Sequence, residues 1–456
     1  MRRADQVSDA VSGALFEPTL RLGVTGLARA GKTVFITSLV ANLMDRGRMG
    51  GLEAARSGRI EAAFLQPQPD DTVPRFEFEA HLAALTGAEP VWPDSTRAVS
   101  ELRLSLRVRP LGLLAGLKGP QTVHLDIVDY PGEWLLDLAL LDKSYAEWSA
   151  QTLARIAARA EAADFLAQAH AEDSTQGLDE ARAQDLAAGF TGYLHAARAA
   201  GWADCTPGRF LLPGDLAGSP ALTFAPLPEA QRPPRGSLWR AFERRFEAYK
   251  SRVVQPFFRD HFARIDRQVV LVDALDVIHR GPEAMAALRD TLTETLAAFR
   301  PGRNAWLSRL LLGRRVERIL FAATKADHLH HTDHARLTAI MQALVRQASE
   351  RARFAGAKTE ALALAALRAT TEETRSHEGR DLPCVRGRLL TTGREAALFP
   401  GTLPDDPARL FHEGGWLDEG FEAMAFAPAP LTLRPGDGPP HIRLDRAADF
   451  LIGDRL

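Results

Sequence analysis

The segment GLARAGKT at residues 26–33 constrains the fold more than any other part of the chain. It fits the pattern G-x-x-x-x-G-K-[ST], in which a glycine-rich loop joins a strand to a helix. The flanking sequence agrees with this pattern. LRLGVT at 20–25 is short and apolar, which predicts a strand, and residues 34–43 carry apolar side chains at helical spacing. The sequence therefore predicts a P-loop at the start of an α/β sheet.

The chemistry of this loop points to phosphate. Glycines let backbone N–H groups approach an anion closely, and the positive end of the following helix faces the same place. We expect the Lys32 ammonium to bridge the β- and γ-phosphates of a nucleotide and the Thr33 hydroxyl to ligate Mg²⁺. The alternative is a structural turn with an exposed lysine. The other loop positions expected to contact the nucleotide are Gly26, Ala28, Arg29, Ala30, Gly31 and Val34.

Composition excludes several classes of protein. The 56 basic residues balance 58 acidic ones, which excludes a histone-like cation and, with 46% hydrophobic residues, a disordered acidic chain. Two cysteines exclude a disulfide scaffold and suit a reducing compartment. No apolar stretch is long enough to span a bilayer. We expect a cytoplasmic protein without a nucleic-acid partner. Only six of the basic residues are lysines, so a lysine inside a motif is informative.

A second motif, Asp129-Tyr-Pro-Gly132, ends the alternating segment QTVHLDIVD at 121–129, which predicts a strand. A carboxylate at the end of a strand beside a P-loop is where the Mg²⁺ shell needs an acid. We therefore expect Asp129 to serve the metal and the Gly132 N–H to sense a γ-phosphate. The alternative is a turn aspartate followed by a structural glycine.

A third motif, Thr324-Lys325-Ala326-Asp327, follows the apolar segment at 318–323 and contains another of the rare lysines. The Asp327 carboxylate could accept from both N1–H and the N2 amino group of guanine, and adenine offers neither donor on that edge. The Lys325 stem could lie along the purine face. The alternative is that Thr324 and Asp327 form a capping pair for the next helix.

Strand and helix patterns alternate along the chain, which predicts a three-layer α/β core. Further strands are expected at 100–109, forming a hairpin with 121–129, and at 268–273, 318–324 and 362–368. Residues 45–95 are expected to be mostly loop with one helix near 79–86. The predicted organisation is a mobile arm at 1–18, a core at 19–132 and 267–456 that includes a small C-terminal α+β extension, and an inserted helical region at 133–266.

Four stretches together resemble the YcjX family of bacterial stress-induced, Ras-like P-loop GTPases: GLARAGKTVFITSLVANL, WPDSTRAVSELRL, VDYPGEWLLDL and FAATKADHL. The resemblance runs from about Arg21 to the C-terminal tail. It implies a Ras-like core that binds GTP or GDP with Mg²⁺, hydrolyses GTP slowly, and acts as a nucleotide switch in a bacterial stress or envelope response. It also implies an unidentified protein partner, through which the chain would sit at the periphery of the inner membrane.

The resemblance also implies residue roles. Lys32 and Thr33 would hold phosphate and Mg²⁺, Asp129 and Gly132 would form the second switch, and Thr324, Lys325 and Asp327 would hold guanine. The first-switch threonine, a further Mg²⁺ ligand, should be Thr96, with Thr72 as the competitor. The backbone of Ala369, Thr370 and Thr371 would meet the guanine O6.

The chain departs from the Ras-like pattern at two positions. Glu133 stands where a water-orienting glutamine is usual, and a carboxylate near a γ-phosphate meets like charge. We expect Glu133 to turn outward and pair with an arginine such as Arg97, which could then stabilise transition-state charge in a partner-bound state. Thr324 replaces the commoner asparagine. This change weakens the contact between the loop expected to hold the guanine base and the P-loop.

Two other functions remain open from the sequence. The chain could be an ATPase in which Asp327 only caps a helix, or a nucleotide-binding scaffold with negligible hydrolysis. Four histidines close together in the sequence are interpreted as a polar helix start, with a metal cluster as the alternative. The arginine-rich segments are interpreted as solvated helix faces rather than as contacts to nucleic acid or lipid. These histidines are His328, His330, His331 and His334.

Overall fold

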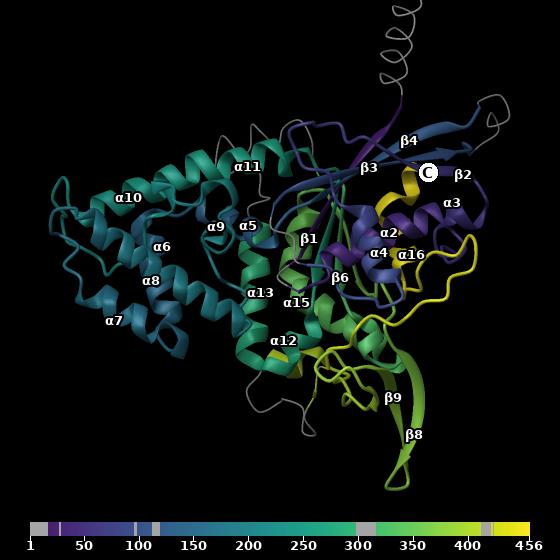
Figure 1. The fold of residues 1–456 in the computed structure, drawn as a ribbon. Helices are drawn as coiled ribbons and strands as arrows, with labels where there is room; N and C mark the ends of the chain where they lie inside the picture. The colour runs from purple at the N-terminus through teal and green to yellow at the C-terminus, as the bar shows by residue number, and fades with distance from the viewer. Residues whose placement is uncertain are drawn as a thin grey trace, which may run out of the picture.

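A seven-stranded mixed sheet forms the centre of the molecule, with the order β2-β3-β4-β1-β5-β6-β7 (Figure 1). The computed structural model describes residues 17–26, 29–94, 98–111, 119–297, 316–411, 421–422 and 424–456. The strands are β1 (Thr19–Gly26), β2 (Ile60–Gln66), β3 (Ser100–Val108), β4 (Gln121–Asp129), β5 (Arg267–Val272), β6 (Arg318–Ala323) and β7 (Lys358–Ala363).

Strands β4, β1, β5, β6 and β7 run parallel, and β3 pairs antiparallel with both β4 and β2. The predicted hairpin of β3 and β4 is therefore confirmed. The prediction for 45–95 was wrong in part, because this stretch contains the edge strand β2 and a short helix, α3 (Glu53–Arg56). Strand β2 has two alanines and weak alternation, so its pattern is faint. The strand predicted at 362–368 was misplaced: β7 begins at Lys358, because an edge strand tolerates the polar start KTE, and it ends at Ala363.

Helices cover both faces of the sheet. On one face lie α2 (Lys32–Met44), α4 (Phe78–Thr86) and α16 (Leu444–Ile452). On the other lie α12 (Ala274–Arg280), α13 (Pro282–Ala297) and α15 (His334–Phe354). Alternate residues of β5 enter the two cores, which explains why this buried parallel strand is apolar almost throughout.

The chain between β4 and β5 contains helices that extend to one side of the sheet (Figure 1). They pack around an aromatic core in which the Trp148 and Phe246 rings stack at 5.0 Å and Phe190 and Phe224 pack edge-on to Trp148. We call residues 133–266 the helical region. Its elements are α5 (Gly132–Leu136), η2 (Asp137–Leu140), α6 (Tyr145–Ile156), η3 (Ala160–Ala162), α7 (Ala163–Ala171), α8 (Glu180–Ala199), α9 (Gly208–Leu211), η4 (Gly214–Leu216), η5 (Pro220–Leu222), α10 (Leu238–Tyr249), η6 (Lys250–Val254), α11 (Gln255–Asp260) and η7 (Phe262–Arg264).

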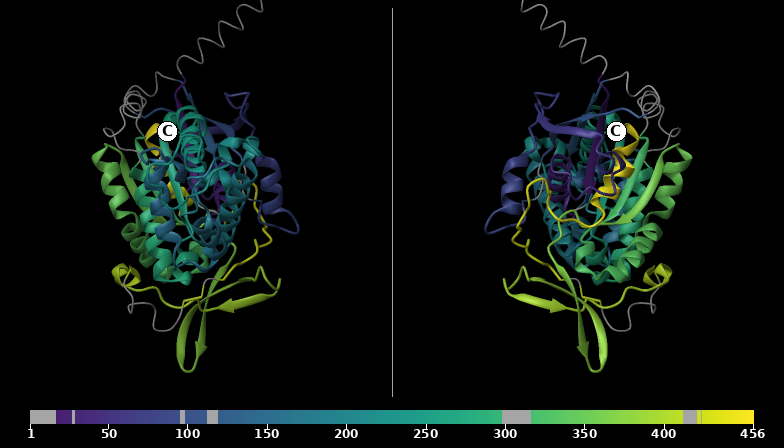
Figure 2. Two further views of the ribbon diagram at one scale, coloured as in Figure 1. Left: turned by 90° about the vertical axis from the view of Figure 1, so that its left-hand side faces the viewer. Right: turned by 90° about the vertical axis from the view of Figure 1, so that its right-hand side faces the viewer.

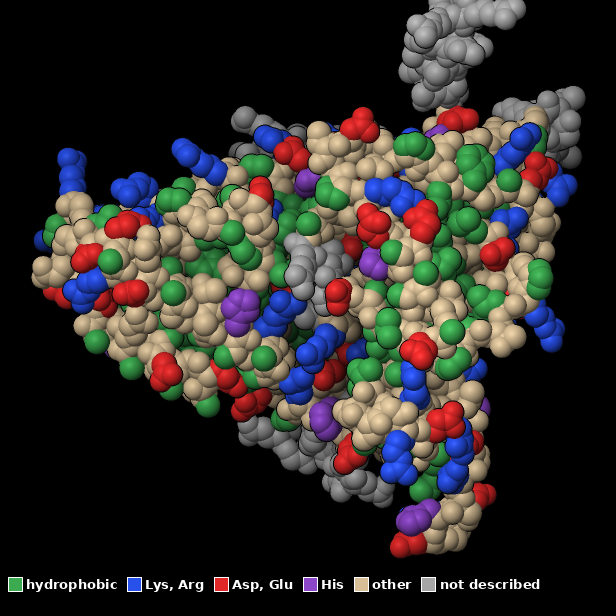
Figure 3. Space-filling view, in the orientation of Figure 1, with side chains coloured by type: hydrophobic (Ala, Val, Ile, Leu, Met, Phe, Trp, Pro, Cys, Tyr) green, Lys and Arg blue, Asp and Glu red, His purple; other side chains and the backbone are tan. Residues whose placement is uncertain are grey.

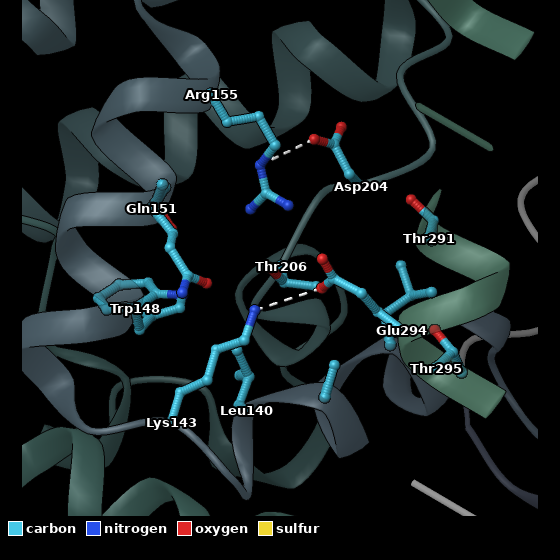
Figure 4. A pocket seen from close by; sticks show the side chains of 13 residues that line it. Leu140, Lys143, Trp148, Gln151, Arg155, Asp204, Thr206, Thr291, Glu294 and Thr295 are labelled. Atoms are coloured by element: carbon cyan, nitrogen blue, oxygen red, sulfur yellow. Dashed lines mark hydrogen bonds and ion pairs between the residues drawn. The ribbon is translucent and has the colours of Figure 1, made fainter. Parts of the chain in front are cut away.

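The helical region also contacts α13, which lies on the same face of the sheet as α12 and α15. Lys143 donates from Nζ to Oε2 of Glu294 at 3.3 Å, and Arg155 pairs with Asp204 at 3.0 Å beside it (Figure 4). Lys143 lies in the loop after η2, and Glu294 lies on α13. This ion pair therefore connects the start of the helical region to a helix of the core.

A small antiparallel sheet projects from the body at the end opposite the marked C-terminus (Figure 2). It has the order β10-β9-β8 and follows the loop after β7. Its strands are β8 (Thr371–His377), β9 (Arg380–Arg388) and β10 (Glu395–Leu398), and the remaining short elements are η8 (Ala326–His328), η9 (His331–Asp333), η10 (Pro407–Phe411) and η11 (Gly453–Arg455). Among the described residues, no helix is both long enough and apolar enough to cross a membrane.

Candidate functional site

The three sequence motifs meet at one edge of the sheet. The register pairs Val24 with Asp129, Gly26 with Leu271 and Ala323 with Ala363, so the carboxyl ends of β4, β1, β5, β6 and β7 lie side by side. Ligands of open α/β sheets bind at this edge. Acidic and basic side chains are interspersed over the face of the molecule shown in Figure 3, without a single large basic patch.

The loop after β1 requires glycine at two positions. A Cβ on Gly26 would lie 2.8 Å from the Leu271 carbonyl oxygen, and Gly31 has φ 81°, which side chains rarely adopt. Helix α2 begins directly after Gly31 and contains Lys32 and Thr33 in its first turn, both buried. The burial of Lys32 contradicts the alternative of a turn with an exposed lysine. Among the other predicted contacts, Arg29 has φ 64°, Ala30 is buried and Val34 is half-buried, whereas Ala28 lies outside the described residues.

Asp129 and Gly132 occupy the end of β4 and the start of α5. Asp129 is the last residue of its strand and is 2% exposed, and Gly132 is buried. Between them, the Tyr130 hydroxyl donates to Oε1 of Gln268 at 2.8 Å, which fixes the turn against β5. The Thr33 hydroxyl and the Asp129 carboxylate come from neighbouring segments and are hard oxygen donors, which is the ligand type that Mg²⁺ prefers. The residues present therefore fit the expected metal.

Glu133 does not turn outward, so that part of the prediction was wrong. Its side chain is 6% exposed and lies 2.8 Å from Nη2 of Arg198, a residue of α8 in the helical region. No local feature of the sequence indicates this partner, because the two residues meet only when α8 packs against α5. Thr96 and Arg97 lie outside the described residues. The competitor Thr72 is exposed, and its hydroxyl donates to Oδ1 of Asp70 at 2.6 Å.

The loops after β6 and β7 are joined through Asp327. Its Oδ2 accepts the Ala369 N–H at 2.8 Å, and its backbone oxygen accepts the Thr370 hydroxyl. Asp327 and Thr370 are both about 4% exposed. The structure thus brings together the two segments that the sequence assigned to guanine, although Thr371 is the exposed first residue of β8.

Thr324 and Lys325 are held by the end of β5. The Thr324 N–H donates to the Val272 carbonyl at 2.9 Å, and Lys325, at φ 59°, pairs through Nζ with Asp273. Neither η8 nor α15 has a side-chain hydrogen bond at its N-cap. The observed hydrogen bonds therefore do not support the alternative in which Thr324 and Asp327 serve as a capping pair.

A cavity of about 350 Å³ lies against the P-loop, between α5, α8 and α12. Sequence reasoning missed the contribution of α8 to this cavity, because nothing local in the sequence indicates where that helix docks. The residues that carry its charge are Arg29, Glu133, Arg198, Asp273, Asp276 and Arg280, with His195 beside them.

The histidine-rich segment after β6 is divided between core and surface. Nδ1 of His331 lies 2.6 Å from Oε2 of Glu372, and ligand atoms of His330, His331 and Glu372 lie within 4.8 Å of one another. His334 is buried and hydrogen-bonds the Ala326 carbonyl at 2.8 Å, so it acts as a structural residue at the start of α15. The four histidines therefore do not form a single cluster.

Comparison with known proteins agrees with this geometry. Residues 20–456 match the model of the YcjX-like family, DUF463. A protein of Escherichia coli strain K12 named Ras-like GTPase YcjX is 39% identical over the full length of both chains. A protein of the same name from Shewanella oneidensis strain MR-1 is 36% identical over 96% of this chain and 94% of its own.

Proposed function

Because the chain belongs to the YcjX-like family, we propose that it is a guanine-nucleotide-binding protein that hydrolyses GTP slowly with Mg²⁺ and acts as a nucleotide switch. The relatives named above are called Ras-like GTPases, and the sheet is mixed and mostly parallel with the P-loop after its central strand. We extend the proposal to a Ras-like core at 19–132 and 267–456, into which the helical region is inserted.

One observation favours guanine over adenine. The Asp327 carboxylate is buried at the ligand edge of the sheet, where Oδ2 accepts the Ala369 N–H. This bond orients the carboxyl group and joins the loop to the segment proposed to meet O6. A fixed carboxylate can accept from N1–H and the N2 amino group of guanine. Adenine offers neither donor, so the lone pairs that the Ala369 N–H does not use would stay unsatisfied in a buried place, which is costly.

The phosphate end is proposed to work through charge and positioning. Lys32 would bridge the β- and γ-phosphates, the P-loop N–H groups would bind their oxygens, and the Gly132 N–H would contact the γ-phosphate. Mg²⁺, when held by Thr33, Asp129 and Thr96, supplies neutralisation of the phosphate charge. As part of this proposal, Thr96 keeps the role of Mg²⁺ ligand, and Arg97 keeps the role of stabilising transition-state charge in a partner-bound state but not the predicted pair with Glu133.

The switch is proposed to act through the contact of α5 and η2 with the later elements of the helical region. The Asp137 carboxylate, four residues after Glu133, accepts the Gly208 N–H at 2.8 Å and the Tyr249 hydroxyl at 2.5 Å. A change at Gly132 would therefore be transmitted to α9 and α10. The surface of the helical region would then differ between the GTP-bound and GDP-bound states, and a protein partner would recognise that difference. We place this encounter in the cytoplasm, at the periphery of the inner membrane, during a stress response.

Thermal-shift titrations with GTP, GDP and ATP, each with Mg²⁺, test the proposal. We expect GTP and GDP to raise the melting temperature at micromolar concentrations and ATP to do so only at much higher concentrations. Single-turnover hydrolysis then separates a slow GTPase from a scaffold. Equal shifts with ATP would favour the ATPase alternative, and GTP binding with no detectable turnover would favour the scaffold.

A further inference from the structure

The residue that directly follows the second-switch glycine is paired with an arginine of the helical region. Nη2 of Arg198, on α8, lies 2.8 Å from Oε1 of Glu133. The glutamate side chain is 6% exposed and the arginine side chain is 25% exposed. The contact is an ion pair without hydrogen-bond geometry, since Oε1 of Glu133 accepts no hydrogen bond among the described residues. The attraction is therefore Coulombic, and separating the two side chains would leave the buried carboxylate without its counter-charge.

The position of this pair is set by the elements around it. Glu133 lies in α5 next to Gly132, and the cavity of about 350 Å³ bordered by Glu133 and Arg198 is also lined by Arg29 of the P-loop. If the γ-phosphate binds between the P-loop and Gly132, as the proposed function requires, Arg198 lines a cavity that adjoins this place through Arg29 of the P-loop and Glu133 of α5.

Other arginines of the same cavity have different surroundings. Arg280 is held by Asp276, with Nε 2.8 Å from Oδ2, and it also donates to the Ala200 carbonyl. Arg29 belongs to the P-loop itself, where its backbone has φ 64°. Arg198 differs from both in that its ion-pair partner, among the described residues, is the second-switch residue Glu133.

We propose that Arg198 stabilises the charge of the transferring γ-phosphoryl group, so that the helical region supplies a catalytic arginine within the same chain. We further propose that Glu133 holds Arg198 until GTP binds. A phosphate can accept two N–H groups of a guanidinium at once, as a carboxylate can, and it carries more negative charge, so it competes with Glu133 for Arg198. This inference rests on the proposed GTP hydrolysis.

The chemical step assigns no proton to the arginine. A water oxygen forms a bond to the γ-phosphorus, and the bond from that phosphorus to the β–γ bridging oxygen breaks. The electron pair of the broken bond passes to GDP, and a water proton passes to the released phosphate. Arg198 remains a cation throughout, since a guanidinium does not lose its proton in a protein, and it contributes by neutralising charge on the γ-phosphoryl oxygens.

Single-turnover hydrolysis of GTP by Arg198→Ala tests this role. Arginines that act on a transferring phosphoryl group contribute about 10³–10⁵ in rate, so we expect a loss of at least about 100-fold with GTP affinity within threefold of wild type. A second measurement uses fluorescent GDP and aluminium fluoride, a mimic of the transferring group. Wild type should bind the pair more tightly than GDP alone, and Arg198→Ala should lose that gain.

Arg182→Ala is the matched control for this variant. Arg182 lies on the same helix α8 but pairs with Glu172 at 2.9 Å at the surface, with 58% of its side chain exposed. The Arg182→Ala substitution removes one positive charge from α8 without changing the cavity. The single-turnover rate of this variant and its response to aluminium fluoride should therefore match those of wild type. Equal losses in Arg182→Ala and Arg198→Ala would overturn the specific role of Arg198.

Glu133→Gln tests the holding role. Removing the carboxylate charge should release Arg198 and raise the single-turnover rate at least threefold, and the same substitution in Arg198→Ala should have no effect. An unchanged rate would overturn the holding role, and a collapse of the rate would make Glu133 itself catalytic.

The remaining outcomes separate this inference from the proposed function. If wild type hydrolyses GTP and Arg198→Ala does so within threefold, Arg198 is not the arginine, while the GTPase proposal stands. If Arg97→Ala loses the rate and Arg198→Ala does not, the role belongs to Arg97. If wild type neither binds guanine nucleotide nor hydrolyses GTP, both proposals fail.

Discussion

Lys32 and Asp327 show how much of the proposed chemistry depends on single side chains. Lys32 is 9% exposed in the first turn of α2, directly after the left-handed Gly31, and Asp327 is 4% exposed beneath the loop that contains Ala369. Both charged groups are buried. Burying a charge is costly unless it meets a partner, which is the physical reason for expecting phosphate at the first and guanine at the second.

We predict that Lys32→Ala lowers GTP affinity about 10- to 100-fold, since a hydrogen bond to a charged group contributes about 1.5–3 kcal/mol. Titration with fluorescent GTP measures this change, and a thermal melt reports the fold. Lys358→Ala is the control, because Lys358 is exposed at the start of edge strand β7, away from the motifs. Affinity within threefold of wild type in Lys32→Ala, with an unchanged melting temperature, would refute the P-loop assignment.

We predict that Asp327→Asn changes the preferred nucleotide from guanosine to xanthosine triphosphate. The asparagine oxygen can still accept the Ala369 N–H, and its amide can donate to the C2 oxygen of xanthine, which the carboxylate would repel. Competition between GTP and XTP for the variant measures the change. If the variant binds GTP as wild type does and does not bind XTP, the base assignment is wrong and ATP becomes the better candidate.

Among the elements, η2 connects the second switch to the helical region through a buried carboxyl group. Burial raises the pKa of Asp137 to about 7, while hydrogen bonds from the Tyr249 hydroxyl and the Gly208 N–H and the charge of Arg209 oppose that shift. As pH rises, the unfolded chain therefore releases this proton near the ordinary pKa of 3.8, whereas the folded state keeps it until about pH 7.

This shift predicts the pH dependence of stability. Between about pH 4 and pH 7 the folded state binds more protons at Asp137 than the unfolded state, so the contribution of this residue to stability falls as pH rises and levels off above about pH 7. Asp137→Asn, which retains an acceptor for Gly208 and a donor for Tyr249, should remove that decline. Urea unfolding of both proteins from pH 4.5 to 8 measures it, and parallel pH profiles would contradict the assignment.

In the molecule as a whole, the helical region contacts the core where the second switch lies. A Cβ on Gly208 of α9 would lie 2.1 Å from the Glu133 carbonyl oxygen of α5, so the two backbones touch directly. Lys143 and Glu294 add an ion pair to α13 (Figure 4). The start of the helical region is therefore held by α9 next to the second switch and by α13 of the core through the Lys143–Glu294 pair.

We predict that Gly208→Ala destabilises the protein by about 1–3 kcal/mol, because the added methyl group meets a backbone atom that cannot move cheaply. Gly192→Ala is the matched control. Gly192 lies in α8 with nothing within 4 Å of an added Cβ, so alanine should raise stability by up to about 1 kcal/mol. Urea unfolding measures both, and equal effects of the two substitutions would contradict the predicted close approach.

The P-loop, the strand that ends at Asp129 and the strand before Thr324 could be predicted from the sequence alone, because each depends on local periodicity and on glycines required by the backbone. The donor pattern of guanine suggested a base-binding role for Asp327, and the family resemblance added the loop at 369–371. Nothing in the sequence indicated the partner of Glu133, the cavity beside α8, or helix α16 on the sheet. These features join segments distant in the chain, and only the packing of the helical region and the C-terminal tail against the core brings them into contact.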